Sequence, residues 1–272
     1  MNIQFEIQSK DGAYLFAQEW KPKKESKAAI ALIHGQGEHS SRYTHVGDFF
    51  TGKGIGLVTF DQRGHGRTKG KRGHLQSEDL MWADIDCILE ETKKRYPQKP
   101  LFLYGYSLGG LYTLSYILKR SPKVNGAICS APLIDTYEPV PSLKITIAKL
   151  MGSIYPSFIL NNGLKADDLS KDVNVVNEYI NDPLVHHYIS AKLGLVVLEN
   201  GRFLKESTKD FPLPLLLMVG SDERIVSKTA IMDYVKGKKN ITSKVWNGLF
   251  HELHNEPEKN EVLHFILSWM NQ

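Results

Sequence analysis

One short segment constrains the fold of this chain more than any other part of it. Residues 105–109 read Gly-Tyr-Ser-Leu-Gly; they follow an apolar run that begins at Leu101 and precede a helical pattern that begins at Gly110. This order predicts a strand, a tight turn and a helix, with Ser107 at the apex of the turn. The glycines indicate that the strand and helix backbones lie too close together for a Cβ atom. Such a turn exposes a serine hydroxyl above the sheet, although a glycine-rich connection with an incidental serine has the same pattern.

A serine nucleophile needs a base and a carboxylate that orients the base, and both residue types follow later strands. The apolar stretch Leu213–Val219 predicts a buried strand, and Asp222 lies just past its end. The strand predicted at Thr242–Trp246 is followed by His251. Because the carboxyl ends of parallel strands meet at one edge of a sheet, these two side chains are expected beside Ser107. The chain order serine, aspartate, histidine is typical of an α/β-hydrolase sheet.

A second backbone donor is predicted upstream of the serine. Ala28–Ile33 reads as a strand, and it runs into the glycine-containing turn His34–His39. That turn can direct the N–H of Gln36 toward the point that the N–H of Leu108 also faces. Two such donors would stabilise the negative charge that develops on a substrate oxygen during acyl transfer.

Five segments together resemble the monoacylglycerol lipase and lysophospholipase branch of the α/β-hydrolases, in order and through essentially the whole chain. The segments are His34–Tyr43, Asp61–Gly66, the turn at Ser107, Asn181–Leu184 and His251–His254. In that family a lipid ester acylates the serine, and water then releases the fatty acid. The resemblance implies the following roles: Ser107 as nucleophile, Asp222 as acid, His251 as base, and Gln36 and Leu108 as oxyanion donors.

The resemblance also implies a site for a glycerol head group. The matching positions are Arg42, Tyr179 and His254, with Glu38 close by. One departure concerns the residues beside the nucleophile, where many lipases of this branch have His and Met and this chain has Tyr106 and Leu108. The catalytic roles tolerate that change, because the oxyanion donor is a backbone N–H.

The spacing of apolar runs predicts a mostly parallel, twisted, eight-stranded sheet flanked by helices, an α/β fold with one insertion. The α/β-hydrolase core is expected at residues 1–133 and 211–272, and a helical cap, or lid, inserted after the sixth strand, at residues 134–210. Within the cap we expect helices around Leu143–Ile154, Val173–Tyr179 and Ala191–Leu204, and no strand. The strands are expected at Ile3–Gln8, Tyr14–Trp20, Ala28–Ile33, Gly56–Phe60, Leu101–Tyr104, Gly126–Ser130, Leu213–Val219 and Thr242–Trp246.

Composition excludes several other classes of protein. The 272 residues are 42% hydrophobic and carry a formal charge of +4, with neither a basic–aromatic pattern for nucleic acid nor an apolar run long enough to span a membrane. The alternating start of the chain does not resemble a signal peptide, so we expect a cytoplasmic protein. His251 and His254 are spaced unlike the histidines of zinc peptidases. No metal or cofactor is therefore expected.

The predicted function is hydrolysis of a single-chain lipid ester, with monoacylglycerol converted to glycerol and fatty acid. A lysophospholipase or general carboxylesterase remains an alternative, and a non-catalytic ligand-binding homologue a more distant one. The cap segment Leu143–Leu160 is apolar on more than one side. One face of it is expected to pack on the sheet domain, and another to face an acyl tunnel or a membrane surface; a transient membrane contact would make the protein peripheral there. No oligomeric state is predicted.

Overall fold

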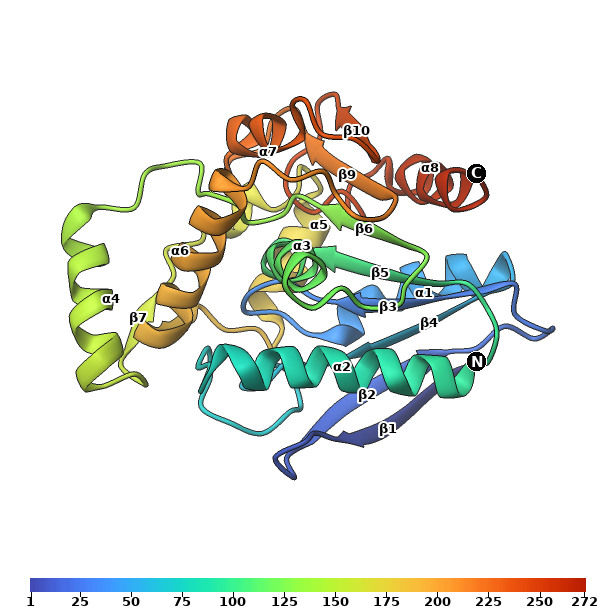
Figure 1. The fold of residues 1–272 in the computed structure, drawn as a ribbon, viewed down its shortest axis with the longest axis horizontal. Helices are drawn as coiled ribbons and strands as arrows, with labels where there is room; N and C mark the ends of the chain where they lie inside the picture. Colours follow the sequence, from blue (N-terminus) through green and yellow to red (C-terminus); the bar gives the residue numbers. More distant parts are fainter.

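The computed structural model describes residues 1–272 and contains the predicted eight-stranded sheet (Figure 1). The first two strands pair antiparallel and the second is antiparallel to its other neighbour, whereas all remaining pairs are parallel. The order across the sheet is β1-β2-β4-β3-β5-β6-β9-β10. The strands are β1 (Asn2–Gln8), β2 (Tyr14–Trp20), β3 (Ala28–Ile33), β4 (Ile55–Phe60), β5 (Leu101–Tyr106), β6 (Gly126–Ser130), β9 (Leu215–Gly220) and β10 (Ile241–Trp246).

Helices cover both faces of this sheet, as Figure 1 shows. One face carries α1 (Thr44–Gly52) and α8 (Lys259–Met270), which contact each other. The other carries α2 (Glu78–Arg95), α3 (Leu108–Arg120) and α7 (Lys228–Val235). Every residue of the five central strands is buried, because a parallel sheet covered on both faces has no solvated side.

The chain between β6 and β9 leaves the sheet and forms a separate group of elements, which we call the inserted segment (residues 134–210). It contains the three predicted helices, α4 (Ser142–Ile154), α5 (Val173–Asn181) and α6 (Ala191–Glu206), and a short 3-10 helix, η2 (Ala166–Asp168). It also contains two antiparallel strands, β7 (Ile159–Asn161) and β8 (Tyr188–Ser190). The expectation of no strand here was wrong, because strands of three residues are too short to show an alternating pattern.

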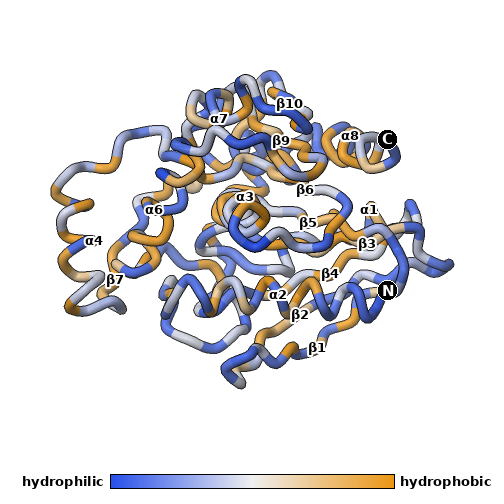
Figure 2. The backbone as a smooth tube through the Cα atoms, viewed as in Figure 1, coloured by the Kyte–Doolittle hydropathy of each residue, from blue (hydrophilic) through white to orange (hydrophobic).

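Helix α4 is the most exposed helix of the inserted segment, and it packs beside α6 at one end of the molecule (Figure 1). Only Ala148 in it is buried, whereas Leu143 and Ile154 are each 71% exposed and Leu150 is 58% exposed. Figure 2 shows that much of α4 is hydrophobic, although the helix lies at the outer edge of the fold. None of the helices combines the length and the hydrophobicity that crossing a membrane requires.

The inserted segment is hydrogen-bonded to the turn that follows β3. Gln36 donates from its side chain to the carbonyl of Tyr188 (2.7 Å), and His186 donates its N–H to the carbonyl of Gly37 (2.9 Å). His39 Nε2 lies 2.8 Å from a carboxylate oxygen of Asp182. These contacts hold the inserted segment over the carboxyl end of β3, the edge of the sheet at which the sequence placed its candidate residues.

Candidate active site

Ser107 occupies a strained turn between β5 and α3. Its backbone has φ 51° and ψ −113°, a conformation that costs energy for a residue with a side chain. A Cβ on Gly105 would collide with the carbonyl of Gly109, and one on Gly109 with the carbonyl of Ile33. Both glycines are therefore required by close backbone approach, as the sequence indicated. The close approach of Gly109 to the carbonyl of Ile33 also brings the start of α3 against the end of β3.

His251 links Ser107 to a carboxylate. Its Nε2 lies 2.9 Å from Ser107 Oγ, and its Nδ1 lies 2.7 Å from Glu223 Oε2. The imidazole is 1% exposed and the Glu223 side chain 0% exposed. This geometry suits a serine hydroxyl that donates to a neutral imidazole, whose other nitrogen donates to a carboxylate.

The carboxylate is not the one that the sequence analysis selected. Asp222 accepts a hydrogen bond from the neighbouring Ser221 hydroxyl (2.6 Å), whereas the two ring nitrogens of His251 pair with Glu223 and Ser107. The chain beyond β9 instead turns Glu223 inward, where its second oxygen accepts N–H groups from Ile225 (2.7 Å) and Val226 (3.1 Å). The expectation for Asp222 is thus corrected to Glu223. α/β-Hydrolases use either acid, so a glutamate beside the selected aspartate was the signal that could have found it.

Electrostatics favour an ionised Glu223. Burial acts to raise the pKa of this carboxyl, but the adjacent His251 and the two backbone N–H groups outweigh burial and lower the pKa below its usual value. The group therefore carries its negative charge at neutral pH. A fixed charge there holds the Nδ1–H tautomer of His251 and stabilises the imidazolium that forms when the ring takes a proton.

Two backbone N–H groups are available beside Ser107. The N–H of Leu108 is the first of α3, where a helix provides no acceptor of its own. The N–H of Gln36 donates to no acceptor within the protein. The contact of Gly109 with the carbonyls of Ile33 and His34 places the turn containing Gln36 next to the start of α3. The two predicted donors therefore lie on adjoining loops.

Arg42 and Glu38, predicted to lie near a head group, are joined in a buried ion cluster. Arg42 donates from Nε to Glu38 (3.2 Å) and from Nη2 to both carboxylate oxygens of Glu252 (3.0 and 2.8 Å). The other oxygen of Glu38 accepts the N–H of Gly35 (2.6 Å) and the hydroxyl of Tyr43 (2.7 Å). Glu252, which the sequence analysis did not select, follows His251 directly in the chain.

The chain is similar to known hydrolases along most of its length. The family model described as serine aminopeptidase, S33, matches residues 24–258. The chain belongs to this family. Monoacylglycerol lipase of Mycolicibacterium smegmatis is 30% identical to it over 255 residues, 92% of this chain and 90% of that protein. Monoglyceride lipase of Mus musculus is 31% identical over 267 residues, 96% of this chain and 88% of that protein.

An uncharacterized abhydrolase domain-containing protein of Dictyostelium discoideum is 37% identical over 257 residues, and this chain spans 27% of its length. The crystal structure of Paleococcus ferrophilus monoacylglycerol lipase has a TM-score of 0.86 and 33% identity, covering 94% of this chain and 98% of that one. The protein is therefore a monoacylglycerol lipase-like α/β-hydrolase and an ester hydrolase, which confirms the predicted family and fold.

In this hydrolase, the two remaining candidates for the head group are buried and have polar atoms without a protein partner. The hydroxyl of Tyr179, on α5, is unpaired, and its ring lies 5.0 Å from the guanidinium carbon of Arg42. Both ring nitrogens of His254 are unpaired. The His254 ring stacks on Tyr43 (4.8 Å) and meets the edge of Tyr106 (4.9 Å). Burial lowers the pKa of His254 well below its usual value, so the ring is neutral.

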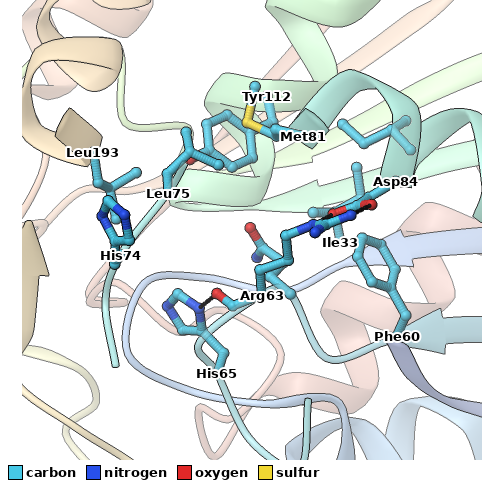
Figure 3. A pocket seen from close by; sticks show the side chains of 12 residues that line it. Ile33, Phe60, Arg63, His65, His74, Leu75, Met81, Asp84, Tyr112 and Leu193 are labelled. Atoms are coloured by element: carbon cyan, nitrogen blue, oxygen red, sulfur yellow. Dashed lines mark hydrogen bonds and ion pairs between the residues drawn. The ribbon is translucent and has the colours of Figure 1, made fainter. Parts of the chain in front are cut away.

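A small cavity lies between β3, β4 and α2. Figure 3 shows it between Phe60, Arg63 and His65 on one side and Leu75, Met81 and Leu193 on the other. Ser107 does not line it, and its volume of about 20 Å³ would hold a single water molecule. The cavity is therefore too small to receive an acyl chain.

Proposed function

We propose that this enzyme hydrolyses monoacylglycerol to glycerol and fatty acid through Ser107, His251 and Glu223. The observation that carries the proposal is the unbroken hydrogen-bonded series from the strained serine through His251 to a buried, ionised glutamate. Two relatives, a monoacylglycerol lipase and a monoglyceride lipase, are similar to this chain along almost their whole length and support the choice of substrate.

The reaction has two steps. Ser107 Oγ attacks the ester carbonyl while His251 Nε2 takes the hydroxyl proton, and the N–H groups of Gln36 and Leu108 stabilise the oxyanion. His251 then gives that proton to the departing glycerol oxygen, which leaves an acyl-enzyme. In the second step water attacks the acyl carbon while His251 takes a proton from that water. His251 then returns the proton to Ser107 Oγ as the fatty acid leaves.

The head group would be held by Tyr179 and His254. An unpaired, buried hydroxyl or imidazole nitrogen costs free energy that a substrate hydroxyl can recover. The Tyr179 hydroxyl is also near the oxyanion turn, 3.7 Å from where a Cβ on Gly37 would stand. Glu38 and most donors of Arg42 are already bonded within the protein. They would therefore contribute less direct contact with glycerol than the family resemblance implies.

A matched pair of substrates tests this function. A monoacylglycerol and a p-nitrophenyl ester with the same acyl chain should both be cleaved by the wild type, and neither by Ser107→Ala. Tyr179→Phe and His254→Ala should weaken monoacylglycerol hydrolysis by at least tenfold more than ester hydrolysis, because p-nitrophenol has none of the glycerol hydroxyls. Equal losses on the two substrates, or a wild-type preference for lysophosphatidylcholine, would leave only the general esterase or the lysophospholipase.

We also propose that α4 rests on membrane surfaces while the enzyme collects its substrate. Its exposed Leu143, Leu150 and Ile154 lie on the same helix as the exposed Lys144 and Lys149, a combination that suits the interface of an anionic bilayer. When phosphatidylglycerol vesicles are sedimented, the wild-type protein should be found in the pellet with them. The triple variant Leu143→Ser, Leu150→Ser, Ile154→Ser should stay in solution yet still cleave a soluble ester, and undiminished sedimentation would rule out α4 as the contact.

A further inference from the structure

Arg42 is the point at which three parts of the active site meet. It lies in the 3-10 helix η1 (Ser40–Tyr43), shortly after the turn that carries Gln36. Its guanidinium bonds Glu38 in that same turn and Glu252 in the loop that carries His251. The ring of Tyr179, from the inserted segment, lies against its other side. A single buried cation thus connects the oxyanion turn, the base and the inserted segment.

The ion cluster is buried, and burial restricts the movement of its side chains. The side chains of Arg42, Glu38 and Glu252 are 8%, 2% and 1% exposed. Ion pairs removed from water are only weakly screened, and breaking one leaves an uncompensated buried charge. Burial alone would lower the pKa of Arg42, but the two carboxylates outweigh it and raise that pKa, so the cation is permanent.

Glu252 transmits this constraint to the base. It is the next residue after His251, and its N–H donates to the carbonyl of Leu169 (2.8 Å) in the inserted segment. Its carboxylate also accepts a hydrogen bond from Asn255 (2.6 Å) on the far side of the loop. With its backbone and side chain both held, Glu252 leaves the neighbouring imidazole little freedom to move away from Ser107.

We propose that Arg42 and Glu252 form a positioning pair that fixes His251 relative to the oxyanion turn, whichever alcohol leaves. The inference rests on the proposed roles of Ser107 and His251. It differs from the head-group role of Arg42 that the family resemblance implies. A ligand of glycerol acts on substrates that contain glycerol, whereas a positioning residue acts on the turnover of every ester.

The test compares kinetic constants of Arg42→Met, Arg42→Lys, Glu252→Gln and the double variant Arg42→Met, Glu252→Gln on the two substrates described above. Arg42→Met should lower kcat by about 10²-fold on both substrates, the loss expected from a displacement of about 1 Å, with KM changed by less than threefold. The double variant should be no worse than Arg42→Met, because both substitutions remove one interaction. Arg42→Lys should keep more of kcat than Arg42→Met. The lysine ammonium can pair with one carboxylate, but it cannot bind two groups at once as the planar guanidinium does.

A matched control separates positioning from stability. Arg95, the last residue of α2, forms a partly buried ion pair with Glu19 of β2 (2.6 Å), and neither residue belongs to the site. Arg95→Met should unfold at lower temperature yet keep kcat below its transition. A rise in KM for monoacylglycerol alone, or wild-type kcat in Arg42→Met, would overturn the proposal. If Arg42→Met does not fold, unchanged kcat in Glu252→Gln overturns it. Activity in Ser107→Ala would instead refute the proposed function.

Discussion

At the scale of single residues, Ser221 determines which carboxylate reaches His251. Its hydroxyl donates to Asp222 and accepts the N–H of Gly248 (2.7 Å), so that Asp222 is held in the surface turn between the loops after β9 and β10. The next residue then points inward. The sequence predicted that Ser107 and His251 lie side by side, because each follows a distinctive segment. It could not decide between two adjacent carboxylates, because that choice depends on hydrogen bonds from a loop nearly thirty residues away.

The two carboxylates provide a direct test at this scale. Glu223→Gln should lower kcat by about 10³- to 10⁴-fold, because an amide neither holds the Nδ1–H tautomer nor stabilises the imidazolium. Asp222→Asn is the matched control, with the same change of chemistry one residue earlier, and it should keep kcat within about threefold. Steady-state rates on a p-nitrophenyl ester suffice. The reverse pattern would restore Asp222 as the acid.

At the scale of elements, the turn at Ser107 depends on how closely α3 approaches the sheet. Apolar runs and turn residues predicted all eight strands of this sheet within about two residues, and the three helices of the inserted segment nearly as well. Those elements are long enough for periodicity to show. The glycine at position 109 also predicted the close approach of α3 to β3, because only glycine tolerates it. The arrangement of buried ion pairs around Arg42 could not be predicted from the sequence, because the partners of Arg42 come from separate loops.

The close approach of α3 to the sheet can be tested by comparing the stability of two variants in which a helical glycine is replaced by alanine. Gly109→Ala places a Cβ against the carbonyl of Ile33 and should destabilise the fold by about 3 kcal/mol, with loss of activity as the oxyanion turn is displaced. Gly194→Ala, in α6, meets no atom within 4 Å and should instead stabilise the protein by about 0.5–1 kcal/mol. Urea unfolding midpoints compare them. Equal stability of the two variants would contradict the packing described for α3.

At the scale of the whole molecule, three buried histidines join separate loops. His34 follows β3, His65 follows β4 and His186 belongs to the inserted segment. The ring centroid of His65 lies 5.4 Å from that of His34 and 4.7 Å from that of His186. Burial lowers the pKa of His34 and of His186 from 6.5 to about 4, and that of His65 well below its usual value. Asp61 opposes the shift at His34, whereas Arg72 reinforces it at the other two rings.

These rings predict how stability depends on pH. Between pH 6.5 and about 4 the unfolded chain binds more protons than the folded one, so stability is complete above this window and falls as the pH is lowered through it. Urea unfolding at intervals of half a pH unit should show this slope, and His65→Asn should reduce it. A flat stability profile across the window would contradict neutral, buried rings.

The hydrogen bonds between the inserted segment and the catalytic loops have a consequence for how such an enzyme can diversify. Leu169 holds the loop after His251, and Glu256 in that loop accepts bonds from Ser170 (3.2 Å) and the N–H of Lys171 (3.4 Å). Transplanting the inserted segment of a relative would change the geometry of these hydrogen bonds and thereby displace His251. We therefore expect substrate range and catalytic rate to change together in such a chimera, and a productive chimera to need residues 34–39 and 249–256 exchanged along with the inserted segment.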